Sequence, residues 1–158
     1  MSLSVFCTSA LLDMVGKDFE KVVQEWISAG KRQAIHLVFL DPCIANYPDV
    51  SWQKTYGTIP EGKEFARFAK EKAELSFRHR MSTKDIWVTR PWLLQLGDVA
   101  YYGGVFKDGI CVGISGLKED SNHDLAEIFV QMLIKAITGE VAKMNRKMIP
   151  APHLGDLN

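Results

Sequence analysis

The chain has 158 residues, which is enough for one domain with a sizeable core. Its 19 basic and 19 acidic residues give a formal net charge of zero, so the composition does not favour a nucleic-acid or anionic-membrane partner. The sequence contains no apolar run near the roughly 18 residues of a membrane span, no secretory signal pattern and no cysteine–histidine metal motif. We therefore expect a single cytosolic domain over residues 1–158, without a metal site.

Apolar periodicity and chain-breaking residues divide the first half of the chain into several stretches. In chain order, they are an extended arm over residues 1–10, a helix over 13–29, a buried strand over 34–40, a short strand near 43–47 with an irregular loop up to residue 60, and a helix over 61–80. The last of these helices has Lys72 within its apolar stripe. A lysine there must reach the surface, pair with a carboxylate or a main-chain carbonyl, or meet the anionic group of a ligand.

The second half of the chain predicts a β-hairpin followed by a long helix. A short helical turn capped by Ser82 and a short strand over residues 92–96 are expected before the hairpin. Asp108 and Gly109 form the turn, because this pair favours the positive φ angles of a type I′ turn. The helix expected over residues 122–138 has an unbroken apolar stripe, and from residue 140 onward the period is lost and an extended tail is expected.

The hairpin register sorts its side chains onto two faces, because side chains alternate along a strand. One face is apolar and should receive the long helix; it carries Val105, Ile110, Val112 and Ile114. The other face has Gly104 opposite Gly113, bracketed by Phe106 and Cys111 on one side and by Tyr102 and Ser115 on the other. The expected order of helices and strands indicates an α+β fold with an antiparallel sheet.

The two facing glycines leave a bare slot in the sheet, which indicates the close approach of another group. One occupant would be a closely packed helix or a second subunit. The other would be a flat ligand, whose carboxylate Lys72 would hold. The candidate ligand-binding residues are therefore Lys72, Tyr102, Gly104, Phe106, Gly113 and Ser115. We find no nucleophile elbow and no phosphate-binding loop, and none of the four histidines stands out as a ligand.

Two stretches resemble the GlcG/HbpS-like family, which is also called the haem-degrading domain family. Residues 71–80, Glu-Lys-Ala-Glu-Leu-Ser-Phe-Arg-His-Arg, are similar to a helix of that family. Residues 108–117, Asp-Gly-Ile-Cys-Val-Gly-Ile-Ser-Gly-Leu, resemble its Asp-Gly hairpin and its Gly-x-Ser-Gly strand end, and residues 87–94 resemble the link between the two. With the helix that follows, the resemblance covers residues 65–137, about half of the chain.

The resemblance implies a profilin-like α-β-α sandwich with a five-stranded antiparallel sheet and flanking helices. It also implies a homo-oligomer that binds a small ligand, which would be haem, a related tetrapyrrole or a small organic acid. Two alternatives stay open at this point. The first is an enzyme of unknown reaction that uses the same pocket. The second is a non-catalytic oligomeric interaction module.

Overall fold

The structure is a computed structural model, and it describes residues 2–41 and 49–148. The helices are α1 (Ser9–Ala29), α2 (Phe65–His79), α3 (Thr83–Thr89) and α4 (Glu119–Met148), with short 3-10 turns η1 (Leu3–Phe6) and η2 (Pro91–Leu93). The strands are β1 (Ala34–Leu40), β2 (Val50–Gly57), β3 (Gly104–Lys107) and β4 (Ile110–Ser115). None of the described helices is both long enough and apolar enough to cross a bilayer.

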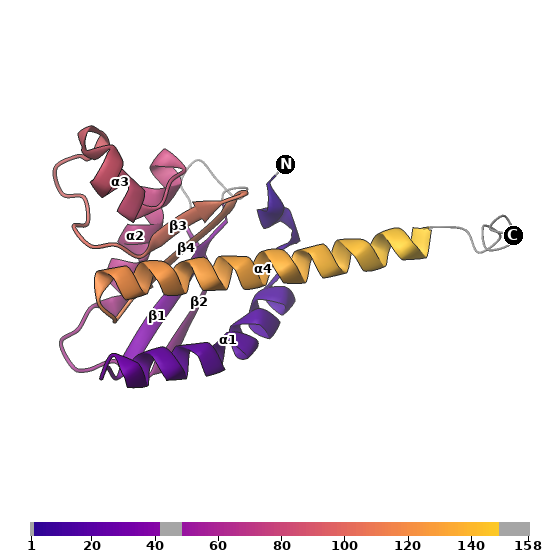
Figure 1. Cartoon of the computed structure of the whole chain (residues 1–158), viewed down its shortest axis with the longest axis horizontal. Helices are drawn as coiled ribbons and strands as arrows, with labels where there is room; N and C mark the ends of the chain where they lie inside the picture. The colour runs from indigo at the N-terminus through magenta and orange to yellow at the C-terminus, as the bar shows by residue number, and fades with distance from the viewer. Residues whose placement is uncertain (1, 42–48, 149–158) are drawn as a thin grey trace, which may run out of the picture.

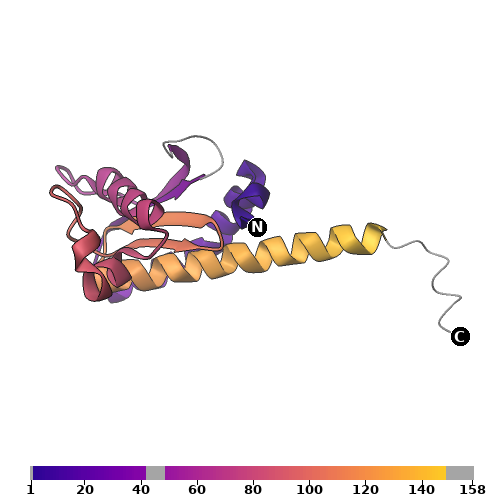
Figure 2. The ribbon, with the colours of Figure 1, turned by 90° about the horizontal axis from the view of Figure 1, so that it is seen from above.

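The strands form one antiparallel sheet in the order β2-β1-β4-β3. Helices α1 and α4 cover one face of this sheet, and α2 covers the other, so the molecule has three layers (Figures 1 and 2). The α+β class predicted from the sequence is therefore confirmed. The described residues contain four strands, not the expected five. The strand expected near residues 43–47 lies outside the described part of the chain.

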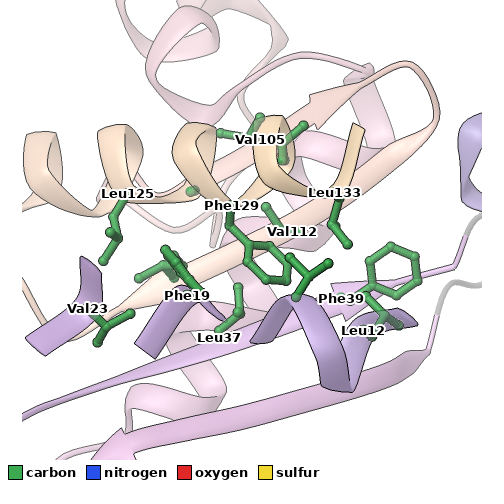
Figure 3. Packing of buried hydrophobic residues seen from close by; sticks show 14 of the residues in the cluster. Leu12, Phe19, Val23, Leu37, Phe39, Val105, Val112, Leu125, Phe129 and Leu133 are labelled. Atoms are coloured by element: carbon green, nitrogen blue, oxygen red, sulfur yellow. The ribbon is translucent and has the colours of Figure 1, made fainter. Parts of the chain in front are cut away.

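The hairpin has the predicted register, with Gly104 opposite Gly113 and Lys107 opposite Ile110. Asp108 and Gly109 have φ angles of 51° and 83°, as a type I′ turn requires. The apolar face of the hairpin packs under α4, as expected. In Figure 3, Phe129 and Leu133 of α4 lie over strand residues such as Val112. The ring centroids of Phe129 and Phe19 are 5.0 Å apart, which joins α4 to α1 above the sheet.

Two expectations outside the hairpin were wrong. The region expected to be an irregular loop contains β2, in which Trp52 and Tyr56 turn toward α1 while the side chains between them are more exposed. The indole N–H of Trp52 donates to the Asp13 carboxylate at 2.9 Å, which ties β2 to α1. A strand was expected over residues 92–96. The structure has η2 and a turn there, because Pro91 fits the first position of a helical turn.

The described residues near both ends of the chain are more ordered than the sequence predicted. Residues 3–6 form η1, whose Leu3 N–H donates to the Asp108 carbonyl at 2.8 Å, so the expected arm is folded against the hairpin turn. The expected tail from residue 140 is helical as far as Met148, because its residues are mostly good helix formers. This last part of α4 extends beyond the rest of the domain (Figures 1 and 2). Residues 149–158 lie outside the described part of the chain.

Candidate functional site

Helix α2 fills the glycine slot of the hairpin. A Cβ atom on Gly113 would lie 2.0 Å from the Ala69 carbonyl oxygen, and one on Gly104 would lie 2.2 Å from the Lys72 carbonyl oxygen. The backbone of α2 therefore rests directly on the two glycines. Of the two occupants that the sequence allowed, the structure contains the helix, and the idea of a flat ligand lying in this slot is wrong.

The other members of the slot face pack against α2 as well. The Cys111 thiol donates to the Ala73 carbonyl at 3.1 Å, and burial raises the pKa of this thiol well above its ordinary value. Phe106 meets the ring of Phe77 edge-on at 6.4 Å. Cys111 is thus a core residue with no exposed thiolate, and Phe106 is a packing residue at the edge of the sheet.

Lys72 is the lysine that the sequence places within an apolar stripe. Its side chain leaves α2 within the apolar stripe and is only 2 % exposed. Its ammonium donates to the main-chain carbonyl of Ile114, at a distance of 3.1 Å from Nζ to oxygen. Among the described residues, no carboxylate forms an ion pair with it within 4.0 Å. Burial lowers the pKa of Lys72 to about 8, and the nearby charge of Glu119 opposes this shift.

Lys72 lines a pocket of about 490 Å³ at one end of the sheet. Its walls come from the chain ahead of β1, the turn before α2, α2 itself, the loop before β3, the end of β4 and the start of α4. It contains three cationic residues and two acidic ones, together with aromatic and polar side chains. The charged members are Arg32, Lys63, Lys72, Glu64 and Glu119; the aromatic members are Phe65, Phe68 and Tyr101; Ser115 and Asn122 are polar.

Local hydrogen bonds hold two walls of this pocket in place. Asn122 accepts from the Leu117 N–H and donates to the Leu117 carbonyl, both at 3.0 Å, which closes the turn between β4 and α4. The Glu119 carboxylate accepts from the Tyr102 N–H at 3.4 Å. On α2, Phe68 lies one turn before Lys72 and meets the Tyr101 ring edge-on at 6.4 Å. The pocket therefore has an aromatic wall and a polar wall around one buried amine.

The structure brings together only part of the predicted site. Lys72 and Ser115 line the same pocket. Gly104 and Gly113 lie beneath α2, and Phe106 lines a different hollow of about 270 Å³. Tyr102 approaches the pocket through its backbone N–H to Glu119.

The cationic and aromatic partners of Lys72 were missed. They come from stretches that are far apart in sequence, so no local spacing connects them. The exceptions are Phe65 and Phe68, because both precede Lys72 on the apolar stripe of the same helix, which was visible in the sequence.

A second hollow is larger but less suited to a site. It has a volume of about 630 Å³ and lies between the end of α1 and the turn before α4, where Lys31, Arg32 and Lys118 line it. All three of these side chains are exposed to solvent, and no buried charged group lines the hollow. The pocket that contains Lys72 is the better candidate, because burial there perturbs a titratable group inside a concave site.

Each histidine in the described part of the chain contacts a neighbouring side chain. His36 bonds to the Thr55 hydroxyl at 2.8 Å and to the Gln53 amide oxygen at 2.9 Å, so it is a satisfied residue of the sheet. His79 accepts from the Arg78 guanidinium at 3.1 Å. His123 contacts the Glu127 carboxylate at 3.2 Å. Within residues 2–41 and 49–148, no group of three or more His, Cys, Asp or Glu side chains is arranged to hold a metal ion.

Comparison with known proteins supports the fold. No protein-family model matches the chain, and no curated protein matches it. A solved structure of PduOC in complex with haem is similar over 82 % of this chain and 93 % of that one, with a TM-score of 0.50. The sequence identity is 19 %, so the likeness concerns the fold alone.

Proposed function

We propose that this protein binds a small organic anion with a flat apolar body, in the pocket that Lys72 lines. The observation that carries the proposal is a buried lysine at a pocket that also contains two exposed cations and an aromatic wall. The volume of about 490 Å³ lies within the usual range for small-molecule sites. Arg32 and Lys63 would attract the carboxylate, while Phe68 and Tyr101 would contact the flat body.

Haem is the second candidate, because the structural neighbour was crystallised with haem. The two carboxylates of a porphyrin suit the cations Arg32 and Lys63. The iron would need an axial donor, and the residues that line the pocket include no histidine, cysteine or methionine. Tyr101 offers a phenol, a group that holds haem iron in other proteins, and it is 57 % exposed. The pocket thus fits the acid groups of haem better than its iron.

The test compares the two ligand classes on the same protein. Terephthalate, a flat dicarboxylate, should raise the melting temperature, since a ligand that binds only the folded state stabilises it. Haemin titration followed by visible absorbance should show a shifted Soret band if the iron gains a protein ligand. Tyr101→Phe should remove that shift if Tyr101 supplies the ligand. If neither terephthalate nor haemin binds at millimolar or micromolar concentration respectively, the proposed function is wrong.

Matched variants on α2 test the role of the pocket. Lys72 is buried at the pocket, whereas Lys70 is exposed on the same helix. Lys72→Met should weaken terephthalate binding by about tenfold, the effect of losing roughly 1.4 kcal/mol. Lys70→Met should leave it unchanged. Equal effects of both substitutions would place the ligand elsewhere.

We also propose that the chain forms a closed homo-oligomer and works in the cytosol. Large apolar side chains stand in solvent along α3 and the loop after it: Val88 is 62 %, Trp92 74 % and Leu96 107 % exposed. Exposed apolar side chains that form one patch are typical of protein–protein contact surfaces. Sedimentation at micromolar concentration measures the state, and a monomer there would contradict this proposal.

A further inference from the structure

We propose that Lys72 is a reactive amine, which forms a reversible imine with an aldehyde or ketone group of the bound ligand. The inference rests on the proposed function, because it needs a ligand in the same pocket. The ligand class that it names is an oxo acid, whose carbonyl carbon lies at Lys72 and whose carboxylate lies toward Arg32 and Lys63. The support comes from the position of the amine, its hydrogen-bond partner and the acid Glu119 in the same pocket.

The side chain of Lys72 is held in one place. A Cβ atom added at Gly103 would meet Lys72 Cδ at 3.0 Å and Asn122 Cβ at 3.1 Å, so the aliphatic chain runs through a narrow gap at this glycine. At its end, Nζ bonds to the Ile114 carbonyl. An amine fixed in this way loses little further freedom when it reacts with a ligand in the pocket.

The hydrogen-bond partner of Lys72 suits a neutral amine as well as a charged one. A neutral amine has two N–H groups and one lone pair, and a single carbonyl acceptor uses one N–H and leaves the lone pair free. A carboxylate in contact would instead stabilise the ammonium form and keep the nitrogen unreactive. The direct acceptor here is the carbonyl of Ile114.

Burial increases the share of the neutral form. A pKa of about 8 means that roughly a tenth of the amine is neutral at pH 7 and half at pH 8. Desolvation of this kind activates nucleophilic lysines in enzymes. Lys72 is the one buried lysine among the described residues, and the remaining lysines there are exposed or half-exposed. The chemistry is therefore expected at this lysine and not across the surface.

The step balances without an oxidant or a reductant. The lone pair of the amine forms a bond to the carbonyl carbon, and the π electrons of the carbonyl move to its oxygen. That oxygen gains a proton while the nitrogen loses one, which gives a carbinolamine. A second proton then adds to the hydroxyl, which leaves as water as the nitrogen lone pair forms the C=N bond, and the nitrogen gives up its remaining proton to leave the neutral imine. Glu119 lines the same pocket, and its charge acts on the Lys72 amine, so we assign the proton transfer to its carboxylate.

Reductive trapping on the full chain tests the inference. The protein is incubated at pH 7 with 4-carboxybenzaldehyde and cyanoborohydride, and the modified residue is found by peptide mass mapping. Apart from the α-amino group, whose ordinary pKa is also about 8, we expect one lysine adduct, on Lys72, formed at least tenfold faster than any adduct on exposed Lys70. Terephthalate, which has no aldehyde, should compete with the labelling.

Each outcome supports or overturns the inference. Labelling spread evenly over the surface lysines overturns it, as does unchanged labelling of Lys72→Met or Lys72→Arg. Lys72→Arg keeps the positive charge, so it covers the case in which the Met variant does not fold. If terephthalate raises the melting temperature and Lys72 is not trapped, the imine is wrong and the proposed function stands. If neither terephthalate nor haemin binds and Lys72 is not trapped, both are wrong.

Discussion

Replacing Gly113 by alanine tests how closely α2 packs on the hairpin. The new Cβ atom would lie 2.0 Å from the Ala69 carbonyl oxygen and 3.0 Å from both N and Cβ of Ala73. Main-chain atoms cannot turn aside as a flexible side chain can, so α2 has to retreat by about 1 Å to restore ordinary contact. Overpacking of this kind costs about 1–3 kcal/mol. Lower entropy of the unfolded chain offsets up to about 1 kcal/mol of it.

The net expectation for Gly113→Ala is a loss of about 1–2 kcal/mol in the free energy of unfolding. For a chain of this length, that corresponds to a melting temperature lower by about 2–8 °C. Urea denaturation followed by circular dichroism measures it. Gly139 is the matched control, because it lies within α4 and nothing stands within 4 Å of its added Cβ. Gly139→Ala should therefore stabilise the protein by about 0.5–1 kcal/mol. If Gly113→Ala is as stable as the wild type while Gly139→Ala behaves as expected, the close packing of α2 is wrong.

Three further predictions concern the buried polar groups. The pKa of Lys72 is about 8 in the folded protein against 10.5 ordinarily, so the unfolded chain binds more protons between these values. The stability of the wild type relative to Lys72→Met should therefore rise from about pH 8 to about pH 10, and urea titrations that show no such rise would contradict the burial of the amine. Thr83→Val should lower the free energy of unfolding, measured by urea denaturation, by about 2 kcal/mol or more, because the Thr83 hydroxyl accepts from the buried N–H groups of Gly103 and Gly104 at 3.0 and 3.1 Å. A loss below about 0.5 kcal/mol would mean that water takes the place of the hydroxyl. The Cys111 thiol should resist iodoacetamide until the protein unfolds, because burial raises its pKa, and peptide mapping that finds it alkylated in the native state would refute this.

Local patterns predicted the parts of the fold that local physics determines. The Asp108-Gly109 turn specified the hairpin and its register, and the 3.6-residue period specified the buried face of α4. Strand β2 was missed because strand-breaking residues, such as Gly57 at its end, indicated a loop, although the apolar residues Val50, Trp52 and Tyr56 fall on one face of a two-residue period. The free end of α4 was missed because the apolar period stops where the helix leaves the core, although helix-forming residues continue.

The candidate site could be predicted at two of its residues, Lys72 and Ser115. Lys72 was identifiable because its conflict with the apolar stripe lies within a single helix. Arg32, Lys63 and Glu119 join it through the tertiary fold, which brings three distant stretches to one end of the sheet. The occupant of the glycine slot could not be decided from the sequence, because a helix backbone and a flat ligand both require two residues without side chains.

The contact between α2 and the glycine pair also determines how accurately the amine is placed. The atom that a Cβ on Gly104 would strike is the carbonyl oxygen of Lys72 itself, so the residue that lines the pocket is also the residue whose backbone rests on the hairpin. Its side chain then returns to the same hairpin at Ile114. Lys72 is thus aligned at both ends on one pair of strands. A ligand would therefore bind to an amine that folding has already ordered, so its binding would cost little further conformational entropy.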